Sequence, residues 1–437
     1  MNKNRYLTLH ALRVFAAHNG NRDELGQPKQ MMFGDAVRTT MSTQAQKRIV
    51  RVHHLGDNIG TRTRRFALKL FAAMQQANPA APLYYLLLMA RAIISAYATP
   101  GNAESDDKGK NVEKKKLLKE ITDLVTACAS EAKPKDKDQE KLRDLYDSDK
   151  GMDAVDAYLS TGETYFFSPP EMETALELAR TLAAEKNPQN FIKDHLQAEK
   201  GKVKSEFKPA FLKDKNLILT EAQAGSEGTT PDIMATGRFS AKHPEATISG
   251  AISMAWTFTV HPGVIEHDYF TAVDDLPSRD GNGGAAHQGD AWFTSGLSYL
   301  CMIIDLEQLL KLAGGNRKVA VKALRLWAEG FLTFTPQGRK RAMHGNTGME
   351  YALAVRSNFE PTSLASAFFQ SLDTQGATED GIILEAISKI EDRHAAMLET
   401  HGTRYCPVGD SRINLRAKAG ERGSLDALLA YAAADLE

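Results

Sequence analysis

The pattern of apolar and polar positions predicts several strands. Residues 6–14 alternate loosely between apolar and polar side chains, which is typical of a strand. Residues 298–306 predict a buried strand that continues into a helix, and the pair Gly314-Gly315 suits the end of that helix. A further strand is expected over 351–355. These strands are far apart in the chain and must pair through long connections.

The same pattern predicts helices between and beyond these strands. Residues 319–331 form an amphipathic pattern, and 362–372 is also expected to be helical. The apolar run 248–260 fits either a helix or a strand, and we favour a helix. Residues 232–239 predict a strand with a glycine bend. Strands flanked by helices with long insertions indicate an α+β fold on a small antiparallel sheet.

A clear helix start follows the first strand. Thr43 and Gln46 fit a capping box, and Ser42 lies directly before them. The apolar residues at 45, 49 and 52 are spaced to face the core. Another face carries Gln44, Lys47 and Arg51. A cationic face beside a helix N-terminus suits phosphate, because the free N–H groups and the helix dipole both favour an anion.

A change in composition indicates an insertion. Residues 101–150 contain 12 Lys or Arg and 13 Asp or Glu, which is half of the segment, against 25% charged residues overall. Within it, residues 113–125 predict a helix with one apolar stripe, and Lys115, Lys116 and Lys119 lie opposite that stripe. From composition alone, these lysines are typical of a solvated helix face, since acidic residues are their neighbours.

The insertion is expected to be mostly helical. Residues 81–98 are apolar but interrupted by Pro82, Arg91 and Ser95, which predicts a buried helix and not a membrane span. Another helix is expected over 169–185. We therefore expect one body built from residues 1–75 and 216–437, with a helical insertion over 76–215.

Charge is distributed unevenly along the 437 residues. The net charge is −1, but residues 1–70 contain 13 Lys or Arg and only 4 Asp or Glu. Six cations fall within a short stretch of loop and helix, with few acidic residues to balance them: Arg22, Lys29, Arg38, Lys47, Arg48 and Arg51. This excess favours a polyanionic partner over a merely solvated face.

The sequence gives little indication of disulfides, of a metal site or of a catalytic motif. The 3 cysteines are far apart, which excludes a disulfide framework and a cysteine-based zinc site. His261 and His267, with Glu266 or Asp268 beside them, match no helical metal-ligand spacing, so we expect no metal and no cofactor. No phosphate-binding loop or nucleophile elbow is found. The start of the chain does not resemble a signal peptide, and we expect a cytoplasmic protein.

Three stretches together resemble a known family. They are Asn21-Arg-Asp with Phe33-Gly and Ser42-Thr-Gln-Ala-Gln-Lys-Arg; residues 232–239; and Asp268-Tyr-Phe-Thr-Ala-Val-Asp-Asp-Leu, followed by Ala286-His and Thr294-Ser-Gly. In combination they resemble the CasC (Cse-type) backbone subunits of Cascade, the type I-E CRISPR surveillance complex. The resemblance covers residues 1–70 and about 215–375, whereas the insertion and the C-terminal region match poorly.

The resemblance implies a fold and a function. The fold would be an RRM-like (ferredoxin-like) palm, a helical fingers insertion and a protruding thumb at about 261–296. Such subunits are not enzymes. Several copies, six in the family's filament, polymerise along a CRISPR RNA and hold its sugar-phosphate backbone without reading sequence. The bases remain free to pair with target double-stranded DNA. The expected partners are therefore CRISPR RNA, target DNA, further copies of the chain and other Cascade subunits, but no membrane.

The resemblance also implies site residues. Lys115, Lys116 and Lys119 resemble a lysine-rich finger helix that holds DNA. Phe239 occupies the place of an apolar wedge, where an aromatic ring could stack on a base; otherwise it is a core residue. The RNA-binding set that the resemblance and the basic cluster imply is Asn21, Arg22, Lys29, Arg38, Ser42, Gln44, Lys47, Arg48, Arg51, Arg238, Phe239, Thr271, Ala272, Val273, His287, Arg339, Lys340 and Arg341.

Departures from the family pattern and two rival functions remain open. Ala36 stands where some relatives have a basic residue, and Met254-Ala-Trp-Thr replaces a stretch that contains more histidine. One rival is a backbone subunit that cuts target RNA with Asp23 and a divalent metal, although Asp23 more simply orients Arg22 through an ion pair. The other is a general RNA-binding chaperone of ferredoxin-like fold. The repeat sequence, protospacer motif, copy number and role of the long fingers do not follow from the sequence.

Overall fold

The computed structural model describes residues 4–57, 59–101, 112–213, 215–218, 220, 229–273, 285–376 and 378–437. It divides into two compact units. The sheet unit comprises Met1–Asn58, Met234–Thr236 and Gly250–Glu437, and the helical unit comprises Ile59–Ile233 and Gly237–Ser249. The predicted insertion, residues 76–215, lies within the helical unit. Each unit is described separately below.

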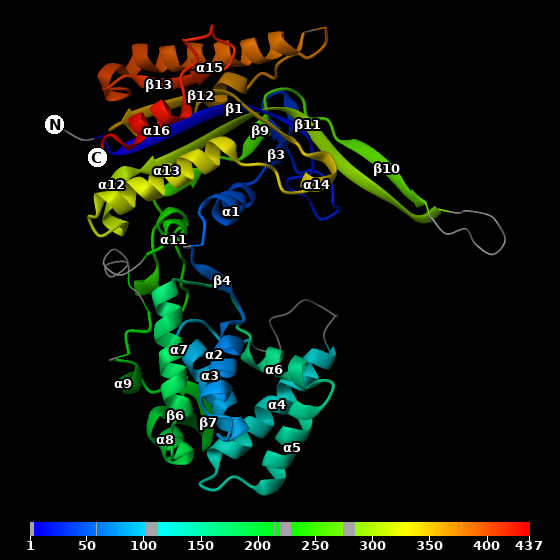
Figure 1. Ribbon diagram of the computed structural model, residues 1–437, viewed down its shortest axis with the longest axis vertical. Helices are drawn as coiled ribbons and strands as arrows, with labels where there is room; N and C mark the ends of the chain where they lie inside the picture. Colours follow the sequence, from blue (N-terminus) through cyan, green and yellow to red (C-terminus); the bar gives the residue numbers. More distant parts are fainter. Residues whose placement is uncertain are drawn as a thin grey trace. The chain divides into compact units, whose positions relative to one another are not determined.

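The sheet unit is built on one antiparallel sheet (Figure 1). Along the main path of this sheet the strand order is β13-β12-β1-β11-β9-β3-β2, while β8 and β10 also pair with β11. The strands are β1 (Tyr6–His18), β2 (Gln30–Phe33), β3 (Ala36–Met41), β8 (Ile252–Met254), β9 (Thr257–Thr259), β10 (Glu266–Val273), β11 (Ala285–Asp305), β12 (Asn346–Ser357) and β13 (Asp410–Asn414). The predicted α+β class with an antiparallel sheet is therefore confirmed.

The centre of this sheet contains two split β-α-β units, in which a third strand lies between the two strands of the unit. Helix α1 (Thr43–His54) lies between β1 and the β8–β9 segment in sequence, and α13 (Arg317–Thr333) lies between β11 and β12. In space the strands run β12-β1-β11-β9, so each helix connects two strands that are separated by a third. The register is set around β1, where Leu9 lies opposite both Met302 and Ala354.

Helices cover both faces of the sheet. Helices α12 (Leu306–Leu312), α13 and α16 (Leu425–Ala433) contact β1, β12 and β13 on one face. On the other face Leu12, Tyr299 and Leu353 belong to a buried cluster with η2 (Leu364–Phe368) and α15 (Glu379–His401). Because neighbouring strand residues point to opposite faces, Leu7, Leu9 and Ala11 line the first face. Little of the central sheet surface is left for a ligand.

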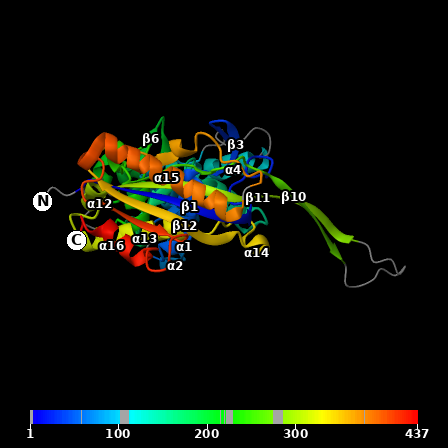
Figure 2. The same ribbon diagram turned by 90° about the horizontal axis from the view of Figure 1, so that it is seen from above.

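A β-hairpin projects from this sheet (Figures 1 and 2). Its strands are β10 and the first part of β11. Glu266 pairs with Phe293 at one end of the hairpin, and Val273 pairs with Ala285 at the other. The second part of β11 pairs with β1, so a single strand of 21 residues, about 70 Å at 3.4 Å per residue, belongs to both sheet and hairpin. The hairpin lies within the range predicted for the thumb. Residues 274–284 lie outside the described residues.

The helical unit packs around α3 (Leu83–Ser95), a helix buried along almost its entire length. This confirms the buried helix predicted over 81–98. Helices α4 (Val112–Ser130) and α7 (Pro169–Ala183) confirm those predicted over 113–125 and 169–185. Among the described residues, no helix is both long and apolar enough to cross a membrane. The other elements are α2 (Phe66–Ala77), α5 (Asp136–Asp147), α6 (Gly151–Leu159), α8 (Pro188–His195), α9 (Pro209–Leu212), and the strand pairs β4–β5 (Thr61–Thr63, Tyr165–Phe167) and β6–β7 (Leu196–Glu199, Lys202–Phe207).

Two predicted elements have the wrong type. The run 248–260 is not a helix but forms strands β8 and β9, because Met254 and Thr259 pair with Met302 and Ser298 of β11. Conversely, residues 232–239 do not form a strand. They contain most of α11 (Pro231–Thr236), which starts at a proline and ends at Gly237, whose φ of 70° is easy only for glycine.

Three smaller expectations also need correction. Residues 362–372 form only the short 3₁₀ helix η2. In α1 the N-cap is Ser42 and not Thr43, since the Ser42 hydroxyl accepts from the Ala45 N–H. Val50 is buried, while Val52, expected in the core, is exposed. The predicted strand over 298–306, the helix after it and the helix over 319–331 are confirmed as β11, α12 and α13.

Candidate nucleic-acid interface

The loop after β1 is held against the start of α1. The Asn21 side-chain oxygen accepts from the Ser42 N–H at 2.9 Å, and the Asn21 carbonyl accepts from the Lys29 N–H at 2.9 Å. The Lys29 carbonyl in turn accepts from the Thr40 N–H at 2.9 Å, which ties the loop to β3. Arg22 is exposed on this loop. Asn21 and Ser42, both predicted site residues, therefore position Arg22 beside the helix N-terminus.

Asp23 shapes the same loop. One of its carboxylate oxygens accepts from the backbone N–H groups of Leu25 and Gln27, both at 2.9 Å. The ion pair with Arg22 that the sequence suggested is not found among the described residues; Asp23 instead stabilises the turn that follows it. This contact limits the freedom of the loop that carries Arg22.

The N-terminus of α1 offers an environment for an anion. Its first turn contains no acidic residue. Gln44 and Arg48 are exposed, and Arg51 is partly buried. The buried Gln46 does not complete a capping box: its amide donates to the carbonyls of Met41 and Ala255, both at 3.0 Å. Gln46 thus fixes the helix start to the end of β3 and to the segment between β8 and β9.

Lys47 has a more internal position than Arg48. Its ammonium group donates to the Ile252 carbonyl at 2.9 Å, and burial lowers the pKa of this group. The backbone contact stabilises the approach of α1 to β8. Lys47 is therefore a weaker candidate for phosphate binding than the two exposed arginines, Arg22 and Arg48.

An exposed aromatic residue, Trp256, lies beside Lys29 of the loop after β1. Lys29 places its ammonium 5.8 Å from the ring centroid of Trp256, which is 41% exposed. This distance is within the range of a cation–π contact. Sequence reasoning left the role of 254–257 undecided and did not include Trp256. A tryptophan within an apolar run was the only signal in the sequence. An exposed ring beside a lysine suits contact with a nucleotide.

Residues 336–341, which include the predicted Arg339, Lys340 and Arg341, form a basic turn that contacts the start of the loop after β1. Gly338 accepts from the Asn19 N–H at 3.3 Å, and a Cβ on Gly338 would lie 1.7 Å from the Asn19 carbonyl oxygen, so only glycine fits. Next to it, Arg339 has a φ of 63° and lies with its guanidinium 6.0 Å from the ring of Phe270 on β10. Lys340 and Arg341 are exposed at the start of α14 (Lys340–Met343). The turn thus brings cations near the loop and the hairpin base.

The hairpin carries the predicted thumb residues. Thr271, Ala272 and His287 are exposed, and Ala272 lies opposite His287 in the strand register. The side chain of Val273 lies outside the described residues. The ring of Phe270 lies 6.0 Å from that of His287. These residues lie on one projecting element of the sheet unit, beyond the cations on the loop and α1.

Two predicted RNA-binding arginines are buried structural residues. Arg38 is 0% exposed, and its guanidinium donates to the carbonyls of Thr259 and Phe368 and to Asp35. Arg238 is 4% exposed, and its guanidinium donates to both carboxylate oxygens of Glu171, at 2.8 and 2.7 Å. Neither can reach a phosphate at the surface. Arg38 was predicted as part of the basic cluster, and Arg238 was predicted from the family resemblance.

The remaining predicted residues lie in the helical unit. Phe239 is 79% exposed and is therefore not a core residue, which was the alternative interpretation. Lys115, Lys116 and Lys119 are exposed on α4, opposite the buried Leu117, Ile121 and Val125, as the helical pattern predicted. Lys115, Lys116 and Lys119 line an open depression of about 560 Å³.

The histidines considered for a metal have other contacts. His261 accepts from the Leu297 N–H at 3.2 Å through one ring nitrogen and donates to the Pro262 carbonyl at 2.8 Å through the other, and burial lowers its pKa. His267 pairs with Asp290 at 3.0 Å. In the part of the chain that the structure describes, no group of three or more His, Cys, Asp or Glu side chains is placed to hold a metal ion.

Comparison with solved structures shows which known chains have the same fold. A chain in a solved structure named "CRISPR RNA-guided surveillance complex, pre-nicking" matches with a TM-score of 0.68 and 20% identity, over 98% of this chain and 100% of that chain. A chain in a "CRISPR RNA-guided surveillance complex" matches with a TM-score of 0.58 and 18% identity, over 98% and 99%. This chain therefore shares the fold of chains found in such complexes.

The sequence then identifies the family. The model of the family Cas_CT1975, CT1975-like protein, matches residues 7–429, and the chain belongs to this family. No curated protein sequence matches the chain. The finer resemblance to CasC (Cse-type) subunits of the type I-E complex stays a prediction.

Proposed function

We propose that this protein is a subunit of a CRISPR RNA-guided surveillance complex and that it binds the sugar-phosphate backbone of the guide RNA. The observation that carries the proposal is the position of Arg22 and Arg48. Arg22 is exposed on the loop that the Asn21–Ser42 hydrogen bond holds at the N-terminus of α1, whose first turn has no acidic residue. Arg48 is exposed near the middle of the same helix. Family membership and the shared fold support the same conclusion.

The contacts suit a guide of variable sequence. Phosphate contacts position a nucleic acid without reading it, whereas base-edge contacts specify sequence. In common RNA-binding sheets, bases stack on aromatic residues of an open face. Here helices cover both faces of the central sheet, so RNA would lie along the loop and α1 and leave its base edges accessible for pairing. The split β-α-β order supports an RRM-like palm in this role.

Polymerisation is part of the proposal. The β10–β11 hairpin is the natural thumb, since it projects from the sheet unit and exposes Thr271, Ala272 and His287. Successive copies along one RNA would each place this hairpin on a neighbour and interrupt base pairing at regular intervals. Arg339, beside Phe270 at the hairpin, would contact the RNA close to each interruption, together with Lys340 and Arg341.

Target DNA is assigned to a different surface. The helical unit would act as the fingers. Its helix α4 has an exposed cationic face formed by Lys115, Lys116 and Lys119. Ammonium groups on one helix face attract a phosphate backbone without selecting sequence. Arg38 and Arg238 are left out of the proposed site because their guanidinium groups are buried.

The proposed role is binding without catalysis. Asp23, the candidate for a metal-dependent cut, orders its own loop by accepting two backbone hydrogen bonds. Incubation of the assembled complex with complementary RNA and Mg²⁺ tests this. We expect intact RNA; regularly spaced cleavage that disappears in Asp23→Ala would assign the protein to the nuclease class.

Co-purification tests the proposal as a whole. The protein is expressed with its neighbouring genes and a CRISPR array, and the nucleic acid that purifies with it is sized and sequenced. We expect RNA of one discrete length that carries the array's spacers. RNA of mixed length and origin would instead favour a general RNA chaperone, and nucleic-acid-free monomer would reject RNA binding altogether.

A further inference from the structure

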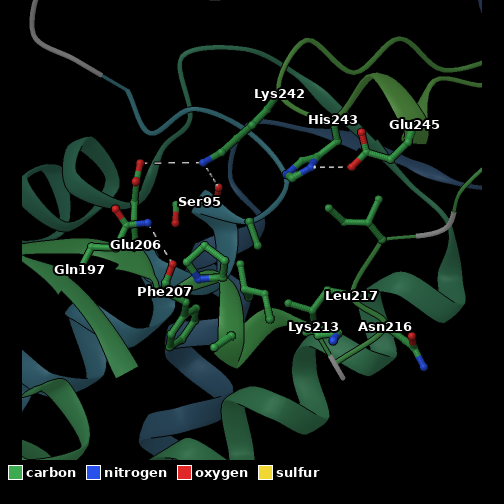
Figure 3. Close-up of a pocket in the computed structure, with 15 residues that line it drawn as sticks. Ser95, Gln197, Glu206, Phe207, Lys213, Asn216, Leu217, Lys242, His243 and Glu245 are labelled. Carbon is green, nitrogen blue, oxygen red and sulfur yellow. Dashed lines mark hydrogen bonds and ion pairs between the residues drawn. The ribbon is translucent and has the colours of Figure 1, made fainter. Parts of the chain in front are cut away.

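A cavity of about 680 Å³ lies in the helical unit, well away in sequence from the proposed phosphate-binding residues (Figure 3). Its walls come from the end of α3, the β6–β7 hairpin, α9 and residues 242–245. The apolar part of the lining includes Phe207, Leu212, Leu217 and Ile218. The volume is in the range of sites for small organic molecules, about 300–1,000 Å³.

Polar groups also line this cavity. The Lys242 ammonium donates to the Ser95 carbonyl and lies 3.9 Å from the Glu206 carboxylate. His243 is held by Glu245, whose carboxylate lies 3.1 Å from the imidazole Nδ1. Figure 3 shows Lys242, His243 and Glu245 in one row, with Gln197 and Asn216 elsewhere around the cavity. A mostly apolar cavity with a few polar groups can orient a flat, amphipathic ligand.

His243 has an unused hydrogen-bonding atom. A carboxylate only accepts hydrogen bonds, so in the neutral imidazole the contact with Glu245 places the proton on Nδ1 and leaves the Nε2 lone pair as an acceptor. This Nε2 is buried and has no hydrogen-bond partner among the residues that the structure describes. A buried polar atom without a partner is costly, and a ligand that donates to it would remove that cost.

An exposed aromatic residue precedes these groups in the same segment. Phe239 is 79% exposed, although its neighbour Arg238 is fixed by the ion pair with Glu171. The segment is also ordered by hydrogen bonds from the Ser240 N–H to Thr247 and from the His243 N–H to Ser240. Phe239 is thus an exposed ring on an anchored backbone, which is how stacking platforms for single strands are built.

We propose that this cavity receives one unpaired nucleobase of the single strand for which Phe239, which does not line the cavity, is already a predicted stacking residue. The two faces of a base can pack against apolar lining residues such as Phe207. Its polar edges can form hydrogen bonds with polar lining groups such as His243. Every common base carries an N–H donor on its pairing edge, which His243 Nε2 could accept, so occupancy would not depend on sequence. The inference rests on the proposed function, since a single strand must be bound nearby.

The test compares strands with and without bases. The full-length protein is titrated with a fluorescent RNA of about 12 nucleotides and with an abasic strand of equal length, at constant salt. The variants are Ala210→Trp, which fills the cavity from an exposed position on its wall, and His243→Ala, which removes the acceptor. The matched control is Ala184→Trp, which adds the same ring to an exposed alanine that does not line the cavity.

The expected result is a loss of preference and not of binding. Wild type and Ala184→Trp should prefer the base-bearing strand, and both cavity variants should reduce this preference by about fivefold, the change expected for one stacked base. Affinity for the abasic strand should not change. The strand, RNA or a DNA of equal sequence, that shows the larger effect is the source of the base.

Two outcomes would overturn the inference, and they differ from a failure of the proposed function. If both variants keep the wild-type preference, the cavity does not hold a base. If photo-crosslinking of 4-thiouridine RNA labels no peptide within residues 239–245, the strand does not approach the segment. Weak binding of every strand by the wild type would instead contradict the proposed phosphate-binding surface and leave these comparisons without their premise.

Discussion

Removal of two exposed arginines should change how RNA binding depends on salt. Arg22 lies on the loop that Asn21 fixes to Ser42, and Arg48 lies on α1, which begins at that contact. Both side chains are exposed, so substitution by alanine removes charge without opening the core. The double variant Arg22→Ala with Arg48→Ala should therefore fold like the wild type and lose two phosphate contacts.

The magnitude follows from counterion release. For a single strand the logarithm of the association constant falls by about 0.7 per phosphate contact for each tenfold increase in salt. Loss of two contacts should flatten the slope by about 1.4, and at about 0.1 M salt it should weaken binding about 25-fold, or about 1.9 kcal/mol. A larger change of affinity with an unchanged slope would indicate damage to the fold and not loss of charge.

The assay is fluorescence anisotropy with nucleic-acid-free protein and an RNA of about 30 nucleotides, titrated between about 0.05 and 0.3 M salt. The control variant is Lys318→Ala with Lys322→Ala, which removes two exposed cations from α13. Lys322 lies eight residues, about 12 Å along the helix, from Gly330, where α13 packs against Val50 of α1. If both double variants flatten the slope equally, net charge and not the loop–α1 surface determines binding.

Three other predictions concern the remaining residues. In the assembled complex, Lys115→Glu with Lys119→Glu should spare guide binding but weaken capture of duplex DNA roughly 60-fold at about 0.1 M salt in gel-shift titrations; equal weakening by Lys137→Glu with Lys141→Glu on α5 would refute a specific role for α4. Glu171→Ala removes the carboxylate that faces the buried Arg238 and should lower the free energy of unfolding by about 3–5 kcal/mol in urea, with no change in the RNA salt slope; a flattened slope would return Arg238 to the RNA site. Burial lowers the pKa of His10 from 6.5 to about 3, so the folded state keeps this ring neutral while the unfolded chain binds a proton below about pH 6.5. The free energy of unfolding should therefore be highest above that pH and fall by about 1.4 kcal/mol per pH unit towards pH 3. His10→Gln should remove this part of the pH dependence, and a profile identical to that of the wild type would contradict it.

Local sequence signals predicted the elements whose own residues determine them. The helix stripe of α4, the glycine pair after α12 and the alternation in β1 are all local patterns, and each element has the predicted type. Strands β8 and β9 were missed because an apolar run of this kind fits both a helix and a strand. Their type is decided by pairing with residues of β11 that lie 39 to 52 positions later in the chain.

The candidate site could be predicted only in part. Residue type and clustering pointed to Arg22 and Arg48, and both are exposed. The same reasoning could not separate them from Arg38, which is buried by carbonyls of distant segments, or from Lys47, whose ammonium group contacts Ile252. Trp256 was missed because its exposure beside Lys29 depends on how the loop packs against β9. Burial and partners are properties of the folded chain, and no local pattern shows them.

The most direct test of the central claim is whether RNA binding depends on sequence. The affinity of the nucleic-acid-free protein is measured for three RNAs of about 30 nucleotides, composed only of A, of C or of U, at the same salt concentration. Binding through phosphates by the loop and α1 predicts dissociation constants within about threefold of one another and equal salt slopes. A preference of about 100-fold for one of the three would require contacts to base edges and would contradict the account.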